Sequence, residues 1–156
     1  MPKPHVFRTT VRWTGNLGSG TSGYRDYSRG YEITAEGKSS PIAGSSAKVF
    51  RGEASRYNPE ELLIAALAAC HMLWLLHLCA DAGIVVTSYE DSAEGDMRTH
   101  PDGSGEFVRV VLRPRIRLAE PVRKSELAAL NHRAHELCFI ARSVNFPVNV
   151  EPVILD

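Results

Sequence analysis

The sequence predicts an α+β fold in one domain that covers residues 1–156. Two observations support this. Short segments rich in β-branched and aromatic residues alternate with glycine and proline turns, and two separate stretches carry helical patterns. The chain shows no internal repeat, low-complexity tract or linker. Its length suits one compact domain, which can bury roughly two thirds of the surface that the unfolded chain exposes.

The N-terminal third is predicted to form a small antiparallel sheet. Residues 6–13 are β-branched and aromatic, as in a strand, and the glycines that begin at Gly15 mark a loop. Residues 31–35 alternate between apolar and polar side chains and stop at a turn signal, Glu36-Gly37-Lys38. A second short extended piece is expected over residues 40–43.

A long helix is predicted to begin at Pro59. Asn58 supplies a capping amide, and proline suits the first helical position because its φ angle is fixed there. Glu60 and Glu61 place two carboxylates in the first turn, where the helix dipole favours negative charge. We expect this helix to run to about Asp81 and to end at Gly83.

The same helix raises the question of a membrane span, because residues 62–80 contain no charged side chain. Nineteen such residues just reach the length of a transmembrane helix. His71 and His77 lie within the stretch, and the rest of the chain has the polar alternation of a protein in water. We therefore expect a helix buried inside a domain or a dimer, and no association with a membrane.

The second half of the chain is predicted to contain more strands and a second helix. A helix is expected to open at Ser125, with apolar residues at helical spacing and with Cys138 at its end. A break is expected at Phe146-Pro147. The extended segments are residues 84–89, the stretch after Gly95, residues 107–118 around Pro114, and residues 148–155, with a hairpin turn at residues 101–105.

Charge and cysteine content narrow the classes of function. The 18 basic and 18 acidic residues cancel, so nothing favours nucleic acid or an acidic membrane surface as a partner, and a small ligand is expected instead. Residues 1–8 have no signal-peptide pattern, which predicts a cytoplasmic protein. The cysteines at 70, 79 and 138 form neither a disulfide framework nor a metal-binding CxxC pair, so a redox or nucleophilic role is expected for them.

The two cysteines of the long helix are expected to face opposite ways. Cys79 lies nine residues after Cys70, which is about 180° around a helix. Cys79 is therefore interpreted as a small buried hydrophobic residue. The stripe that contains Cys70 is predicted to be Leu63, Leu67, Cys70, Trp74 and His77.

Cys70 has candidate partners that would make it a nucleophile. A cation stabilises a thiolate, and the loop before residue 31 offers Arg25 and Arg29, with Glu60 available to orient one of them. Zinc is not expected, because no histidine and cysteine pair has a standard ligand spacing. We also expect no other metal or cofactor.

Two sequence blocks resemble the OsmC/Ohr hydroperoxide reductases. Residues 58–63 read Asn-Pro-Glu-Glu-Leu-Leu, and residues 65–71 read Ala-Ala-Leu-Ala-Ala-Cys-His. This is similar to the family's central helix, in which an Asn-Pro-Glu start lies ten residues before the peroxidatic cysteine. The block around Cys138 is similar to the second cysteine helix of a branch of OsmC-like proteins, although Phe139 stands where better-studied members have proline.

The resemblance implies a fold and a mechanism. The fold would be OsmC-like, with antiparallel sheets packed around a long buried central helix in an intertwined homodimer. Cys70 would reduce a hydroperoxide, form a sulfenic acid and then a disulfide with Cys138, which an external dithiol would reduce. Arg29 is favoured as the activating cation and Arg25 is its rival, with Glu60 holding the guanidinium.

A function from another class also fits the sequence. The chain could be a non-enzymatic carrier of a small apolar ligand, which would bind in a pocket lined by Leu67, Trp74 and Phe139. In that case Cys70 would be an inert residue of the pocket wall. The reactivity of Cys70 toward alkylating reagents at different pH values separates the two functions.

Overall fold

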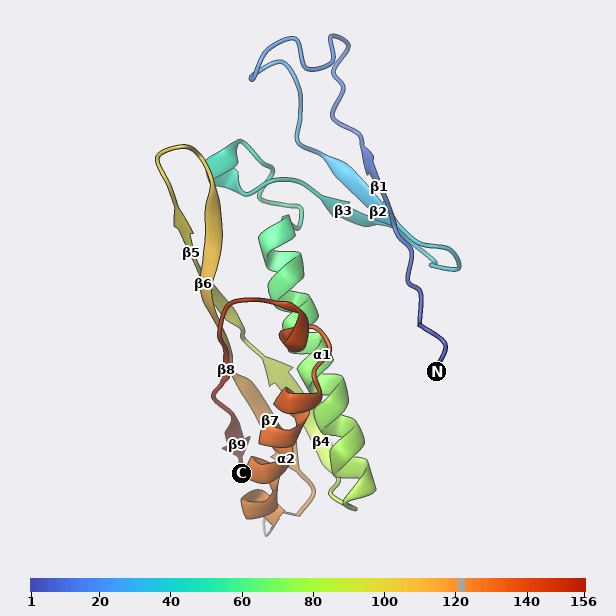
Figure 1. Cartoon of the computed structure of the whole chain (residues 1–156), viewed down its shortest axis with the longest axis vertical. Coiled ribbons are helices and arrows are strands. Elements are labelled where there is room, and N and C mark those ends of the chain that lie inside the picture. The colour runs from blue at the N-terminus through green and yellow to red at the C-terminus, as the bar shows by residue number, and fades with distance from the viewer. Residues whose placement is uncertain (121–122) are drawn as a thin grey trace. The chain divides into compact units, whose positions relative to one another are not determined.

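The computed structural model describes residues 1–120 and 123–156 and confirms the predicted α+β class. The chain forms two compact units, residues 1–62 and residues 63–156, which are described separately here. Figure 1 shows the ribbon of the whole chain. The assignment of residues 1–156 to one domain stays a prediction.

The N-terminal unit contains the predicted small antiparallel sheet. Its strands are β1 (Thr10–Trp13), β2 (Tyr31–Thr34) and β3 (Ile42–Gly44), with β2 in the middle. The first strand is shorter than expected, since residues 6–9 lie outside it and pair with no other strand. A short 3-10 helix, η1 (Lys48–Phe50), precedes the long helix.

Helix α1 (Pro59–Asp81) has the predicted start and end. The Asn58 Oδ1 atom accepts a hydrogen bond from the Glu61 N–H at 2.8 Å, and Glu61 Oε2 accepts one from the Asn58 N–H at 3.1 Å. This reciprocal pair is a capping box. At the other end Gly83 has a φ of 68°, and the Ile84 N–H donates to the Cys79 carbonyl, so glycine closes the helix in a left-handed conformation.

Helix α1 is buried along one narrow stripe rather than all round. The fully buried residues are Leu67, His71, Leu75 and Cys79, each four positions apart. Apart from Leu67, the residues of the predicted stripe that contains Cys70 lie beside this buried line: Leu63, Cys70 and Trp74 are partly buried and His77 is exposed. Among the described residues α1 is also the one helix whose length and composition would suffice to cross a membrane.

The C-terminal unit contains two three-stranded sheets. One consists of β4 (Val86–Asp91), β7 (Pro114–Leu118) and β9 (Val153–Leu155), and the other of β5 (Glu94–Thr99), β6 (Gly105–Leu112) and β8 (Val148–Val150). Each sheet has one antiparallel and one parallel pairing. The expectation of antiparallel sheets is therefore wrong for the two C-terminal strands, because residues 148–155 return alongside β6 and β7 in the same direction.

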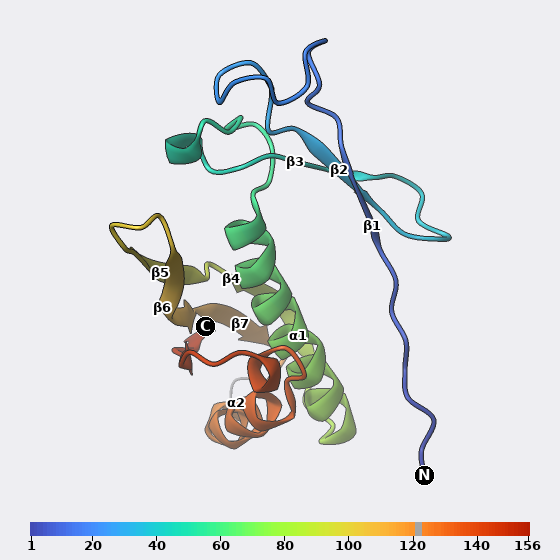
Figure 2. The ribbon, with the colours of Figure 1, turned by 45° about the horizontal axis from the view of Figure 1, so that its top comes forward.

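Helix α2 (Lys124–Leu137) lies beside α1 in both ribbon views (Figures 1 and 2). It ends before Cys138, well before the break expected at Phe146, because the chain turns at Cys138 into a 3-10 helix, η3 (Ala141–Ser143). Among its described side chains, Leu127, Asn131 and Ala134 are buried, and Cys138, directly after its last residue, is buried as well. The apolar contacts of the unit form two clusters, one around Leu75 and Ile116 and one around Leu67 and Val110.

Candidate redox site

Cys70 and Cys138 are neighbours, although 68 positions separate them in the sequence. Cys70 is partly buried on α1, and Cys138 is 1% exposed at the end of α2. Burial is the main cause that raises the pKa of the Cys138 thiol to about 11, and the adjacent Cys70 thiol raises it further. The fold therefore brings the two predicted cysteines together, with Cys138 as the more deeply buried thiol.

The chain around Cys138 holds its sulfur in place. The Ala141 N–H donates to the Cys138 Sγ atom at 3.4 Å, and the Arg142 N–H donates to the Cys138 carbonyl at 3.0 Å. Both donors come from the turn that follows α2. They fix the direction in which the second cysteine faces.

Cys79 is a core residue, as predicted. It is 1% exposed and packs with Leu75, Ile84 and Ile116. Burial raises the pKa of its thiol, which disfavours the reactive thiolate.

Glu60 and Glu61 have different environments. Glu61 serves the capping box of α1. The Glu60 Oε2 atom is buried without a hydrogen-bond partner, and Glu60 adds to the effect of burial in raising the pKa of Tyr31. Glu60 is ten residues from Cys70 on one continuous helix, so about 15 Å of helix axis separates the two positions.

The two candidate arginines also differ. The Arg29 guanidinium lies 4.5 Å from the ring centre of Tyr24 and 4.0 Å from that of Tyr27. It donates to the Tyr27 carbonyl at 2.8 Å and to the Tyr24 carbonyl at 2.6 Å, so Arg29 braces its own loop. The side chain of Arg25 is exposed.

A polar network of the N-terminal unit was missed by the sequence analysis. Glu53 accepts a hydrogen bond from the Ser28 hydroxyl at 3.1 Å and forms an ion pair with Arg56 at 3.2 Å. These contacts connect the loop of Arg29 with the segment that leads into α1. The Arg56 Nη1 and Tyr31 hydroxyl atoms are buried without partners, like Glu60 Oε2. The signal in the sequence was Arg56 itself, a cation four residues before Glu60.

A second missed group lies behind the cysteines. His71 is 0% exposed, and its Nε2 atom is 3.1 Å from the Oδ1 atom of Asn131 on α2. Asp91 and His135 act electrostatically on His71, and Asp91 adds to the effect of burial in raising the pKa of Tyr89. The signal was a histidine inside an otherwise apolar helix stretch, which was interpreted as evidence against a membrane span and rejected as a zinc ligand, but not predicted to be a buried hydrogen-bond partner.

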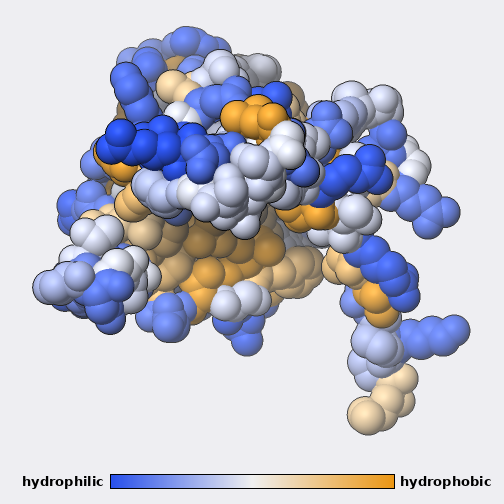
Figure 3. Space-filling model, turned by 90° about the horizontal axis from the view of Figure 1, so that it is seen from above, coloured by the Kyte–Doolittle hydropathy of each residue, from blue (hydrophilic) through white to orange (hydrophobic). Residues whose placement is uncertain are grey.

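An apolar cavity of about 260 Å³ opens beside Cys138 and is lined by Leu73, Trp74, His77 and Phe139. The rings of Trp74 and Phe139 meet edge to face at 5.5 Å. Leu67 does not line this cavity, since it is 0% exposed in the core, which corrects the predicted pocket. Leu73 and Phe139 are 62% and 67% exposed. Figure 3 shows that the molecule has apolar surface open to solvent on the face in view.

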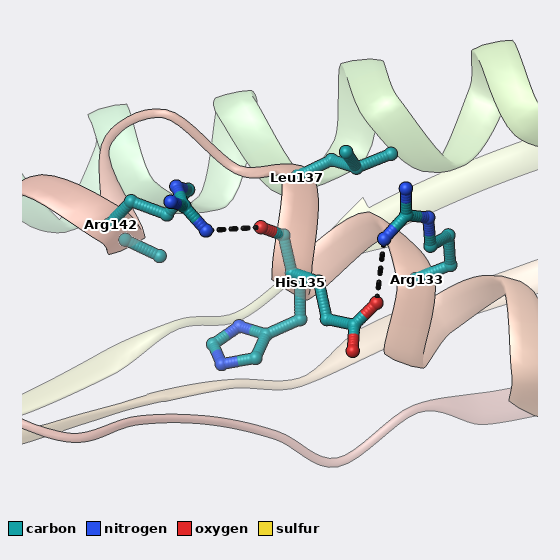
Figure 4. Close-up of a pocket in the computed structure, with 6 residues that line it drawn as sticks. Arg133, His135, Leu137 and Arg142 are labelled. Atoms are coloured by element: carbon teal, nitrogen blue, oxygen red, sulfur yellow. Dashed lines mark hydrogen bonds and ion pairs between the residues drawn. The ribbon is translucent and has the colours of Figure 1, made fainter.

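A polar cavity of about 500 Å³ lies at the end of α2, around residues that flank Cys138. Figure 4 shows Arg133 and Arg142 reaching toward the segment that carries His135. Arg133 pairs with Glu136 at 2.9 Å, and Arg142 donates to the Glu136 carbonyl at 3.4 Å. Among the described residues no group of three or more His, Cys, Asp or Glu side chains is arranged to hold a metal ion.

Comparisons with known proteins agree with this architecture. The sequence profile of the OsmC-like protein family matches residues 52–153. A structure of an OsmC-like protein of unknown function from Vibrio cholerae is 31% identical, with a TM-score of 0.83, over 94% of this chain and 97% of that chain. Among curated protein sequences, none matches.

More distant solved structures share the fold. An organic hydroperoxide resistance protein OsmC from Legionella pneumophila is 19% identical, with a TM-score of 0.67, over 98% of this chain and 100% of that one. An organic hydroperoxide resistance protein from Elizabethkingia anophelis is 16% identical, with a TM-score of 0.69, over 100% and 99% of the two chains. The predicted OsmC-like fold is thus confirmed.

Proposed function

Since the chain belongs to the OsmC-like protein family, we propose that it is a cytoplasmic two-cysteine peroxidase that reduces organic hydroperoxides, with hydrogen peroxide as a smaller alternative substrate. The observation that carries the proposal is the contact between Cys70 and Cys138. The names of the relatives from Legionella pneumophila and Elizabethkingia anophelis, which refer to organic hydroperoxide resistance, support the choice of substrate.

The chemistry needs two steps on the protein. The Cys70 thiolate attacks one oxygen of the hydroperoxide, so an S–O bond forms, the O–O bond breaks, and the other oxygen leaves with a proton as an alcohol. The Cys138 sulfur then attacks the Cys70 sulfenic acid, and its oxygen leaves as water while the disulfide forms. An external dithiol reduces that disulfide by thiol exchange.

The separation of Glu60 and Cys70 along α1 suggests that the active site is shared between two chains. One guanidinium that hydrogen-bonds to a carboxylate and to a sulfur spans less than about 10 Å, which is shorter than the distance along the helix. We therefore assign Glu60 and its arginine, Arg29 or Arg25, to the Cys70 of a second copy in a homodimer. Light scattering after size-exclusion chromatography should give twice the chain mass of 17.2 kDa.

The experiment that tests the function is stopped-flow oxidation with an organic hydroperoxide. Cys70→Ser should abolish peroxide consumption, whereas Cys138→Ser should still react once and accumulate a sulfenic acid that dimedone labels. Cys79→Ser is the matched control, because it removes a thiol from the same helix but should change neither result. Peroxide consumption by Cys70→Ser at the wild-type rate would refute the proposal.

The apolar cavity beside Phe139 favours a second candidate, a carrier of a small apolar ligand. A carrier should bind an apolar fluorophore equally well before and after alkylation of Cys70. Its Cys70 should also alkylate slowly at every pH, whereas the thiolate of a peroxidase reacts fast near neutral pH.

A further inference from the structure

The buried bond between His71 and Asn131 joins the same two helices that carry the cysteines. His71 follows Cys70 directly on α1, and Asn131 shares the buried face of α2 with Cys138. We infer that His71 and Asn131 are positioning residues that orient α2 so that Cys138 meets Cys70. This inference deepens the proposed function, because it concerns the disulfide step of that mechanism.

The hydrogen bonds of Asn131 determine the proton position on His71. The Asn131 Nδ2 atom donates to the Leu127 carbonyl at 3.2 Å, so its Oδ1 atom is left as an acceptor. The His71 Nε2 atom, 3.1 Å away, must therefore carry the proton and donate it. This contact is directional, unlike the apolar packing around it, and it holds at one relative placement of the two helices.

The spacing of the contacts explains why this bond affects the cysteines. Cys70 and His71 are adjacent on α1, but their partners on α2 are seven residues apart, which is about 10 Å along that helix. Two contacts separated by such a distance fix the direction of α2 as well as its position. Loss of the Asn131 contact would leave only the apolar packing of Leu127 and Ala134 to set the angle of α2, and the end that leads to Cys138 would shift the most.

The groups around His71 support the same role from the sheet. Asp91, at the end of β4, accepts a hydrogen bond from the Arg113 N–H at 2.7 Å through Oδ1, while its Oδ2 atom is buried without a partner. The His71 Nδ1, Tyr89 hydroxyl and His135 Nδ1 atoms are also buried without partners. His71 on α1 interacts electrostatically with His135 on α2 and with Asp91 on β4, so this polar group links both helices with the sheet.

The step that depends on this orientation is disulfide formation. The Cys138 sulfur must approach the Cys70 sulfur within bonding distance, while the sulfenic oxygen departs as water together with the Cys138 proton. The first step, in which Cys70 attacks the hydroperoxide, makes no demand on Cys138. Changes at His71 or Asn131 should therefore affect the second step and not the first.

The test measures the Cys70–Cys138 disulfide equilibrium in glutathione redox buffers, which needs no peroxide. His71→Leu, and independently Asn131→Ser, should lower the equilibrium constant for disulfide formation about tenfold, which is a reduction potential about 30 mV less negative. His71→Gln should restore most of it, because its amide nitrogen can donate to Asn131 from nearly the same place. If His71→Leu fails to fold, the disulfide equilibrium of Asn131→Ser still tests the inference.

Leu127→Ala is the control for a general loss of stability, since it removes a buried side chain one turn before Asn131 without breaking a polar contact between helices. It should lower the melting temperature and leave the disulfide equilibrium within about twofold of wild type. In peroxide assays the His71 and Asn131 variants should form the sulfenic acid at the wild-type rate and close the disulfide about tenfold more slowly.

Two outcomes would overturn the inference. One is a wild-type disulfide equilibrium in both His71→Leu and Asn131→Ser, and the other is an equal decrease in Leu127→Ala. If the wild-type protein forms the Cys70–Cys138 disulfide in glutathione buffers but consumes no peroxide, the proposed peroxidase function is rejected. The positioning role would stand in that case, because its main measurement does not use peroxide.

Discussion

The two units of the chain are stabilised in different ways. Both hydrophobic clusters lie in residues 63–156, where leucine, isoleucine and valine side chains of α1, α2 and the two sheets are fully buried. Residues 1–62, all of which the structure describes, contain no fully buried large apolar side chain, and their buried positions are three glycines and Ser45. This unit is held by strand pairing, by the Arg29 brace and by the contacts of Glu53.

The difference in apolar burial indicates separate roles for the two units. A segment of about 60 residues that buries so little apolar surface gains little stability by itself, so it benefits from cover by another surface. The C-terminal unit has the packing to hold two thiols in contact. Residues 63–156 therefore form the scaffold of the two cysteines, and under the proposed mechanism residues 1–62 supply Glu60 and the arginine.

The largest expected effect is a difference in stability between matched apolar truncations. Leu75→Ala should lower the free energy of unfolding by about 2–5 kcal/mol, because Leu75 is 0% exposed and a cavity would remain. Ile33→Ala, on the half-buried central strand of the N-terminal unit, should cost less than about 1 kcal/mol. Urea denaturation followed by circular dichroism measures both, and equal losses would contradict the division into two kinds of unit.

The next effect concerns the cations of the N-terminal unit. Arg29→Ala should slow peroxide reduction by about tenfold to a hundredfold, because a fixed guanidinium stabilises negative charge on sulfur and oxygen. Arg25→Ala should have the smaller effect on the rate, and it should not alter the unfolding free energy by more than about 1 kcal/mol, because the side chain of Arg25 is exposed. Stopped-flow rates decide between the two residues, and wild-type rates in both would remove arginine activation from the mechanism.

Arg29→Lys is the control for charge. It keeps the cation but loses the forked donors that reach two backbone carbonyls. A rate between those of wild type and Arg29→Ala would indicate that the geometry of the guanidinium contributes. A wild-type rate would indicate that charge alone is sufficient.

The sequence predicted best where a local rule decides the structure. Asn58, Pro59 and Gly83 set the ends of α1 to the residue, because capping and left-handed glycine act within one helical turn. The family pattern around Cys70 and Cys138 identified two thiols that the structure places in contact. The roles of those thiols, and of Glu60, Arg25 and Arg29, stay predictions.

The features that the sequence did not predict depend on tertiary contacts. The buried face of α1 is centred on His71 rather than on Cys70, because a buried asparagine of α2 provides the histidine with a partner. That partner is 60 positions away, and no local pattern identifies it. The parallel pairings of β8 with β6 and of β9 with β7 are missed for the same reason, since direction within a sheet depends on the path of the whole chain.

The smallest expected effect is a pH dependence confined to the C-terminal unit. Burial is the main cause that lowers the pKa of His71 below its usual value of 6.5, with a contribution from His135, while Asn131 and Asp91 oppose it. The folded protein therefore resists protonation that the unfolded chain accepts. Stability from neutral His71 should be complete above pH 6.5 and should decrease as the pH falls below that value.

His71→Gln isolates this contribution, because glutamine keeps a donor for Asn131 and has no titrating group in this range. Asp91 acts in the opposite direction, since burial raises the pKa of its carboxyl above 3.8, so protonation of Asp91 favours the folded state at lower pH. Hydrogen-exchange protection factors of α1 and α2 should decrease from pH 7 to pH 5.5 in wild type and less so in His71→Gln. Strands β1 to β3 contain no histidine and should not show this difference between the two proteins. A decrease of the same size in both units and both proteins would mean that the acid sensitivity arises elsewhere than at His71.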